Sequence, residues 1–153
     1  MSTARPSVML APGDGPLRPT PWGEDVVQKV SGELTGGAFS IEELAVPVGS
    51  GRSAYVHHGD DECFYVLTGS FLFWLDGHDV SAVRGSLLYV PRGAARSFRN
   101  SGDHDGRLLV IQTPGEALEP SPEDTEQPEV AGSAGTAHAI TAAVAARYCI
   151  ELV

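Results

Sequence analysis

The segment from Tyr55 to Gly69 constrains the fold of this chain more than any other part of the sequence. It begins with a polar cluster of histidines and carboxylates and continues into an apolar, aromatic-rich run that ends at a glycine: Tyr55-Val56-His57-His58-Gly59-Asp60-Asp61-Glu62-Cys63-Phe64-Tyr65-Val66-Leu67-Thr68-Gly69. This order of residues is typical of a buried strand that carries a few polar groups at its mouth. The sequence therefore predicts a β-structure with polar side chains at the mouth of an apolar interior.

Further apolar runs, separated by turn signals, lie on both sides of this segment. We expect strands over residues 26–30, 39–46, 70–75, 87–90 and 108–112. Asp76-Gly77 predicts a tight turn after the run at 70–75. Because that run has few polar residues, we expect it to be buried on both faces, with Phe71 and Trp74 as contacts to a second subunit. Eighteen glycines and eleven prolines also favour short strands and turns over a helical bundle.

A second group of spaced residues follows, and the two groups together resemble the two sequence motifs of the cupin family, small β-barrels that usually hold a metal. The positions that carry the resemblance are Tyr55, His57, Glu62 and Gly69 in the first motif and Gly85, Pro91, Gly93, Arg96 and Asn100 in the second. Tyr55 stands where the family has its first histidine ligand, and Arg96 stands where it has its last. The segments 34–40 and 145–151 are also similar to bacterial single-domain cupins of the quercetin-dioxygenase-like group.

This resemblance implies an all-β cupin jelly roll, or double-stranded β-helix, and a homodimer. We expect an extended N-terminal arm at 1–23, the cupin barrel at 24–114, an acidic Pro-rich linker at 115–135, and a short C-terminal helix at 136–153. The helix is indicated by Ile140, Val144 and Tyr148, which recur at four-residue spacing in an Ala-rich context. We expect it to pack on the barrel or on a partner chain.

Strand alternation places the candidate site residues on common faces. Residues two apart on a strand point to the same side, so Tyr55 and His57 point together while His58 points away. The cupin spacing implies that Tyr55, His57, Glu62 and Arg96 converge inside the barrel. Phe64 and Phe98 share faces with Glu62 and Arg96, and we expect them to form an apolar, substrate-binding lining.

The chemistry of these side chains leaves two readings of the site open. His57 and Glu62 could hold a divalent metal such as Fe, Zn, Ni or Mn, with Tyr55 as a phenolate ligand, but the guanidinium of Arg96 cannot coordinate one. Without a tightly bound redox metal, Arg96 would pair with Glu62 and anchor an anionic group of a ligand, while His57 and Tyr55 act as acid and base. The remaining histidines, His78, His104 and His138, are expected at the surface.

Composition and charge limit the classes of partner that we expect this chain to bind. The net charge of -10 offers no basic stripe for nucleic acid or an anionic membrane, so we expect a small-molecule substrate and neither of those partners. No run of signal-peptide or membrane-spanning length is present, which favours a cytoplasmic protein. Cys63 and Cys149 are expected to be reduced packing residues.

Three functions are consistent with this sequence. The first is a small-molecule enzyme of bacterial secondary metabolism, similar to single-domain cupin cyclases, that performs cyclisation, isomerisation, dehydration or decarboxylation on an aromatic or polyketide-like substrate. The second is a metal-dependent cupin dioxygenase. The third is a non-catalytic binding module in which the Arg96–Glu62 pair merely fills a lost metal site.

Overall fold

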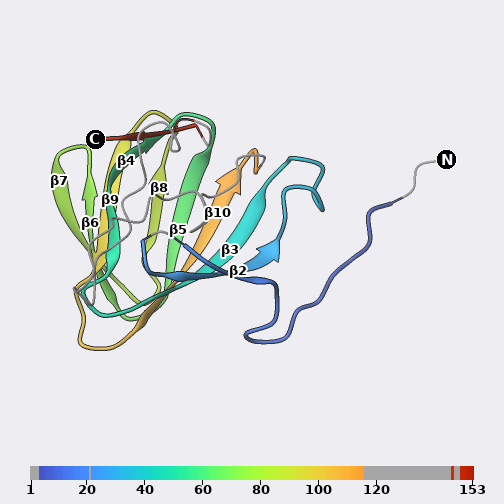
Figure 1. The fold of residues 1–153 in the computed structure, drawn as a ribbon, viewed down its shortest axis with the longest axis horizontal. Helices are drawn as coiled ribbons and strands as arrows, with labels where there is room; N and C mark the ends of the chain where they lie inside the picture. Colours follow the sequence, from blue (N-terminus) through green and yellow to red (C-terminus); the bar gives the residue numbers. More distant parts are fainter. Residues whose placement is uncertain (1–3, 21, 116–145, 147–148) are drawn as a thin grey trace, which may run out of the picture.

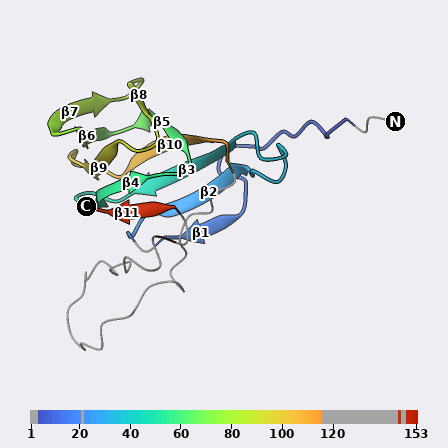
Figure 2. The same cartoon turned by 90° about the horizontal axis from the view of Figure 1, so that it is seen from above.

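Alternating apolar and polar residues build two antiparallel sheets that face each other (Figures 1 and 2). The computed structural model describes residues 4–20, 22–115, 146 and 149–153. The first sheet contains, in spatial order, β1 (Leu17–Pro19), β2 (Asp25–Val30), β3 (Ser40–Val46), β10 (Gly106–Thr113), β5 (Asp61–Thr68) and β8 (Leu87–Val90). The second contains β11 (Ile150–Leu152), β4 (Gly51–His57), β9 (Ala95–Asn100), β6 (Ser70–Leu75) and β7 (His78–Val83). This all-β architecture is the expected jelly roll.

The predicted strands agree closely with the observed ones. Those expected over 70–75 and 87–90 have the predicted bounds. Those expected over 26–30 and 39–46 differ by one residue at the start, and the one expected over 108–112 is longer by two residues at its start and by one at its end. Asp76 and Gly77 have φ values of 50° and 87°, and Leu75 pairs with His78, so they form the two-residue hairpin turn that the sequence predicts. Gly69 has φ of 90°, a conformation that favours glycine, where the chain passes from β5 to β6.

Strand β6 corrects one expectation about a subunit contact. Phe71 is 1% exposed and lies in the core, so it is not available to a second subunit as predicted. Alternation explains the difference, because Phe71 and Phe73 point into the barrel while Leu72 and Trp74 point outward and are half-buried. In the single chain only the inner face of this run is fully buried, and burial of its outer face, with Trp74, against a second subunit stays a prediction.

The interior of the barrel is apolar at one end and polar at the other. The apolar end is a cluster in which four phenylalanines pack with aliphatic side chains, namely Phe64, Phe71, Phe73, Phe98, Leu44, Val66 and Leu108. At the other end Glu62 lies opposite Gln112, which lies opposite Ser40 on the next strand, and all three are buried. The register of the strands therefore gathers polar side chains in one half of the interior.

Short segments toward both ends of the described chain pair with strands of the barrel, which corrects two predicted boundaries. Residues 17–19 lie in the extended arm expected outside the barrel, yet they form β1 and pair with β2 in the first sheet. Residues 150–152 were assigned to a C-terminal helix, but they form β11 and pair with β4, so the helix does not extend over 136–153. The predicted linker from 116 onward and residues 136–145, 147 and 148 of the predicted helix lie outside the described residues. Among the described residues, no helix has the length and apolar character to cross a membrane.

Candidate functional site

The four candidate site residues lie together at the polar end of the barrel. Tyr55 and His57 are two residues apart on β4, Glu62 lies on β5, and Arg96 lies on β9 directly opposite Tyr55. Each of them is no more than 2% exposed. Strand alternation and the register of β4 with β9 therefore place the predicted set on the inner faces of both sheets.

Arg96 and Glu62 form a buried ion pair across the two sheets. Nη2 of Arg96 lies 2.9 Å from Oε1 of Glu62, and neither side chain is exposed to solvent. Nη1 of Arg96 donates a hydrogen bond of 2.7 Å to the carbonyl oxygen of Ala94. Within the part of the chain that the structure describes, Nε of Arg96 has no hydrogen-bond acceptor. The guanidinium is thus fixed in place with a donor still available for a ligand.

Tyr55 connects to both members of this pair. Its hydroxyl lies 3.4 Å from each carboxylate oxygen of Glu62, as a donor at the long end of the hydrogen-bonding range. The Cζ atom of Arg96 lies 5.1 Å from the centre of the Tyr55 ring, which is a cation–π distance. The phenol, the carboxylate and the guanidinium therefore form one contiguous group.

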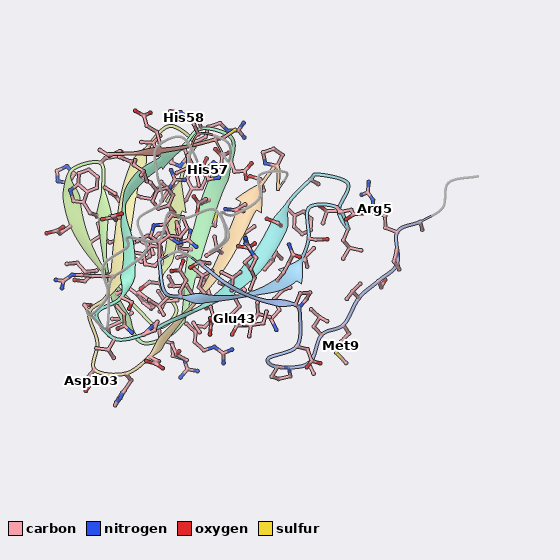
Figure 3. All side chains as sticks on the ribbon, in the orientation of Figure 1. Arg5, Met9, Glu43, His57, His58 and Asp103 are labelled. Atoms are coloured by element: carbon pink, nitrogen blue, oxygen red, sulfur yellow. The ribbon has the colours of Figure 1, made fainter. Side chains whose placement is uncertain are left out.

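His57 is held by the backbone of the loop that follows it. Its Nδ1 accepts hydrogen bonds from the backbone amides of Gly59 at 3.3 Å and Asp60 at 3.1 Å. A neutral ring held in this way carries its proton on Nε2, which lies 3.9 Å from Oδ2 of Asp60. His58 points away as predicted and pairs with the exposed Glu151 at 2.8 Å. Both histidines lie at the end of the barrel far from Asp103 (Figure 3).

The donor set does not fit the metal that the cupin motifs imply. Arg96 occupies one ligand position with a cationic group, and Glu62, the only carboxylate of the motif, is paired with that cation. Among the described residues, no three His, Cys, Asp or Glu side chains are grouped so that they could hold a metal ion. The site as built is a phenol–carboxylate–guanidinium group beside an imidazole.

Phe64 and Phe98 lie beneath this group in the phenylalanine cluster. Their ring centres are 5.7 Å apart, and each packs on Phe73, at 5.3 Å and 5.5 Å. They are 0% and 2% exposed. Both residues therefore lie where the apolar half of the interior begins, and their role in substrate binding stays a prediction.

Sequence reasoning missed a second buried ion pair next to the site. Nε of Arg52 lies 2.6 Å from Oε1 of Glu24, and the two side chains are 1% and 0% exposed. Strict alternation along β4 would place Ser53 on the same inner face as Tyr55. The register of β4 and β9 shifts between Arg52 and Tyr55, however, so Arg52 and Tyr55 both point inward and Ser53 is exposed. A charged residue three positions before Tyr55 is the only sequence signal for this arrangement, and it is weak.

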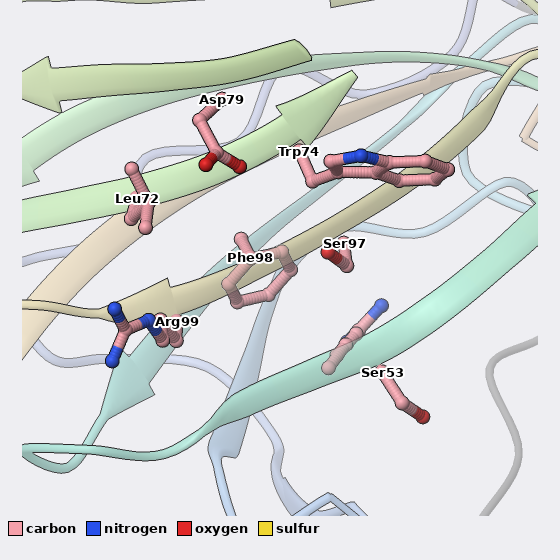
Figure 4. Close-up of a pocket in the computed structure, with 8 residues that line it drawn as sticks. Ser53, Leu72, Trp74, Asp79, Ser97, Phe98 and Arg99 are labelled. Atoms are coloured by element: carbon pink, nitrogen blue, oxygen red, sulfur yellow. The ribbon is translucent and has the colours of Figure 1, made fainter. Parts of the chain in front are cut away.

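A hollow of about 360 Å³ lies on the outer face of the second sheet, away from the four candidate residues (Figure 4). Trp74 and Leu72 of β6 lie beside Ser97 and Arg99 of β9, and Asp79 of β7 faces Trp74 across the strand pair. These are the outward-pointing residues of strands whose other side chains fill the core. None of the four candidate residues lines this hollow, although its lining also includes the buried residues Arg52 and Phe98.

The remaining histidines and the cysteines lie apart from the site. The side chain of His104 is 87% exposed and His78 is exposed, as expected, while His138 lies outside the described residues. Both cysteines are free, but Cys149 is exposed, so the expectation that it packs in the interior is wrong. Cys63 is half-buried, and burial raises the pKa of its thiol.

Comparison with known proteins agrees with this architecture. The sequence profile of the family described as Cupin domain matches residues 43–112. Protein SchB of Streptomyces halstedii is 32% identical over 107 residues, which cover 66% of this chain and 75% of SchB. Quercetin 2,3-dioxygenase of Bacillus subtilis is 28% identical over 81 residues, which cover 53% of this chain and 24% of that enzyme. The chain spans 24–60% of the length of four of the curated relatives that it matches.

Solved structures show the same fold. The crystal structure of a predicted oxalate decarboxylase from Thermotoga maritima aligns with a TM-score of 0.64 at 22% identity, covering 69% of this chain and 97% of that one. At this identity the likeness concerns the fold alone. The family profile, the similarity to SchB and the two-sheet architecture lead to one conclusion: the chain belongs to the cupin family.

Proposed function

We propose that this cupin transforms a small aromatic or polyketide-like molecule of bacterial secondary metabolism by acid/base chemistry, without a tightly bound redox metal. Cyclisation, isomerisation, dehydration and decarboxylation are the reactions that such a site could serve. The observation that carries the proposal is the buried Arg96–Glu62 pair at 2.9 Å, which puts a cation and its carboxylate partner where the motif would otherwise supply metal ligands.

Arg96 is the anion anchor in this proposal. Its Nε has no acceptor among the described residues, and Ala94 and Glu62 hold the rest of the group in a fixed orientation. A fixed guanidinium in a dry site binds a carboxylate, an enolate or a phenolate oxygen and stabilises negative charge that develops on it. Arg96 would therefore both bind the substrate and lower the free energy of an anionic intermediate.

His57 and Tyr55 are the proton-transfer groups. The backbone amides of Gly59 and Asp60 engage Nδ1 of His57, so the neutral ring offers its proton from Nε2. The Tyr55 hydroxyl lies 3.4 Å from both oxygens of Glu62, so a proton that leaves or reaches the phenol can be shared with that carboxylate. This supports His57 as the acid and Tyr55, backed by Glu62, as the second group of an acid/base pair.

The test is turnover of a panel of aromatic and polyketide-like compounds, followed by mass spectrometry, with the wild-type protein and single variants. We expect Arg96→Ala and His57→Ala to abolish product formation, because one removes the anchor and the other removes the proton donor. His104→Ala is the matched control, since this histidine is 87% exposed. Circular dichroism establishes that each variant is folded.

Three outcomes would contradict the proposal. Turnover at the wild-type rate in both site variants shows that Arg96 and His57 take no part in the reaction. Turnover that needs an added divalent metal and stops with a chelator supports a metal-dependent dioxygenase instead. Ligand binding without any product, across the panel, supports the non-catalytic binding module, for which the complete burial of the Arg96–Glu62 pair is the favouring observation.

A further inference from the structure

Five side chains form a continuous stack from the phenylalanine cluster to Arg96. Cζ of Arg52 lies 5.7 Å from the ring centre of Phe98 and 4.5 Å from that of Trp22. The rings of Trp22 and Tyr55 stack with centres 6.4 Å apart and planes inclined by 29°, and Cζ of Arg96 lies 5.1 Å beyond Tyr55. Each guanidinium in the stack thus lies over at least one aromatic ring, and the rings of Trp22 and Tyr55 stack on each other between the two arginines. Tyr55 lies between Trp22 and Arg96.

Trp22 is itself fixed by groups outside the candidate site. Arg52 covers its ring and is paired with Glu24 at 2.6 Å, in a pair that is almost completely buried. The backbone that presents Trp22 is closed by Thr20, whose amide and hydroxyl both donate to the carbonyl oxygen of Glu24, at 3.1 Å and 3.0 Å. The indole is 8% exposed. Trp22 is therefore held in place by the hydrogen bonds of its own turn and by Arg52 of β4, which covers its ring.

The position of Trp22 matters because of what Tyr55 contacts. The phenol must place its hydroxyl within reach of Glu62 and its ring face against Arg96, and a tyrosine ring turns about two side-chain bonds. Trp22 and Ile150 belong to the same buried cluster as Tyr55. Of these two, only the indole offers a flat face that stacks on the phenol ring.

We propose that Trp22, held by the Arg52–Glu24 pair, is a positioning residue that sets the ring plane of Tyr55 in the candidate site. The proposal rests on the proposed function only in giving Tyr55 a role in proton transfer. It makes the N-terminal segment a functional part of the site, although Trp22 lies before the first cupin motif and outside the matched residues 43–112. Arg52 and Glu24 then act on Tyr55 through Trp22.

Fluorine NMR of protein labelled with 3-fluorotyrosine tests the orientation directly. Tyr55→Phe identifies the Tyr55 signal. We expect two resolved resonances for the two ring orientations of Tyr55 in the wild type, because the stacked ring turns slowly, and one averaged resonance in Trp22→Leu. Trp74→Leu makes the same chemical change at the other tryptophan, on the outer face of β6, and should keep the wild-type pattern.

Conservative variants keep the test decisive if Trp22→Leu does not fold. Trp22→Phe retains a stacking ring and should keep the Tyr55 resonances resolved. Glu24→Gln retains the shape of the side chain but removes the charge that holds Arg52, and should bring the Tyr55 resonances toward averaging. If Trp22→Leu folds, wild-type Tyr55 resonances in both Trp22→Leu and Glu24→Gln would overturn the proposal. If Trp22→Leu does not fold, wild-type Tyr55 resonances in Glu24→Gln would overturn it.

Binding of benzoate separates this inference from the proposed function. We expect the dissociation constant for benzoate to rise about three- to tenfold in Trp22→Leu, the range expected for loss of one aromatic stacking contact, and to stay near the wild-type value in Trp22→Phe and Trp74→Leu. Unchanged affinity in Trp22→Leu overturns the positioning role while the anion site stands. Equal benzoate binding by the wild type and Arg96→Ala overturns the proposed anchor, and the NMR comparison still decides the role of Trp22.

Discussion

Arg96 and Glu62 are fully buried charged residues that pair with each other. Their side chains have no exposed surface, and the ion pair spans the two sheets. A buried ion pair often adds little net stability compared with apolar residues of similar volume, but removing one partner leaves a desolvated charge. The pair is therefore a sensitive point of the molecule whether or not it serves catalysis.

We predict opposite effects for breaking and for replacing this pair. Arg96→Met alone should lower the free energy of unfolding by about 3–5 kcal/mol, because Glu62 is left in the interior without its cation. The double change Glu62→Leu with Arg96→Met should lower the free energy of unfolding by about 1 kcal/mol or less. Urea denaturation of the wild type, both single variants and the double variant measures this. A double variant that loses as much as the sum of the single ones contradicts the prediction.

Asp61, beside the site residue Glu62, gives a prediction for the dependence of stability on pH. Its Oδ1 accepts hydrogen bonds from the backbone amide of Arg92 at 2.8 Å and from Nε of Arg92 at 3.2 Å. The backbone hydrogen bond first, and the side-chain one second, hold the pKa of Asp61 below its ordinary value. Because the folded-state pKa is the lower one, this contribution to stability is present above the unfolded-state pKa and is lost as pH falls through the folded-state pKa.

We therefore expect Asp61→Asn to be less stable than the wild type at neutral pH and equally stable once the pH is below the folded-state pKa. Urea denaturation over a series of pH values measures the difference between the two proteins. Asp103→Asn, which changes a carboxylate that is 92% exposed, is the control. A difference for Asp61→Asn that grows as the pH falls would have the wrong sign.

At the scale of elements, the short strand β11 joins the site to the C-terminal end of the chain. Ile150 is opposite His57 and Leu152 is opposite Tyr55 in the antiparallel pairing of β11 with β4. Ile150 is 3% exposed and belongs to the buried cluster of Trp22 and Tyr55. A strand of only three residues depends on such side-chain burial, because it has few backbone hydrogen bonds of its own.

We predict that Ile150→Ala lowers the free energy of unfolding by about 2 kcal/mol, the low end of the range for a buried isoleucine. Amide hydrogen exchange in β11 should speed up more than in β5, because the loss acts locally at the edge of the second sheet. Leu152→Ala, at a half-buried position, is the matched control with a smaller expected loss. Uniform acceleration across both strands would show that β11 does not open on its own.

The same elements show why the sequence predicted some parts of the site and not others. Tyr55, His57, Glu62 and Arg96 lie in regular stretches of strand, where alternation fixes the direction of each side chain. Arg52 lies on the other side of a register shift from Tyr55, and an irregularity of pairing leaves no periodic signal in the sequence.

Two further features depend on contacts between distant segments. Trp22 stands in a proline-rich stretch that reads as an extended arm, and its burial depends on Arg52 and Tyr55 from another strand. Residues 150–152 follow an Ala-rich run with helical spacing, and they form a strand because the edge of β4 is available to pair with them. Tertiary pairing overrides local propensity in both cases.

Across the whole molecule, one half of the barrel interior holds the apolar core and the other half holds the candidate site residues. The phenylalanine cluster, with its aliphatic neighbours, buries the apolar surface that holds the two sheets together. The buried pair of Arg96 with Glu62 lies in the polar half, and the pair of Arg52 with Glu24 lies beside Phe98, where the apolar half begins. A cupin fold can thus keep its core while the side chains at the other end change, which is why the fold alone does not determine the reaction.

The division of the interior makes this barrel a convenient scaffold for protein engineering. The backbone positions of Tyr55 and Arg96 are set by the pairing of β4 with β9, and that pairing continues to Phe98 in the apolar half. The paired changes Tyr55→His and Arg96→His would release Glu62 from its cation and give it and His57 two additional imidazole neighbours. A designer could in this way build a set of metal ligands at the polar end of the barrel by exchanging two side chains, while the phenylalanine cluster stays unchanged.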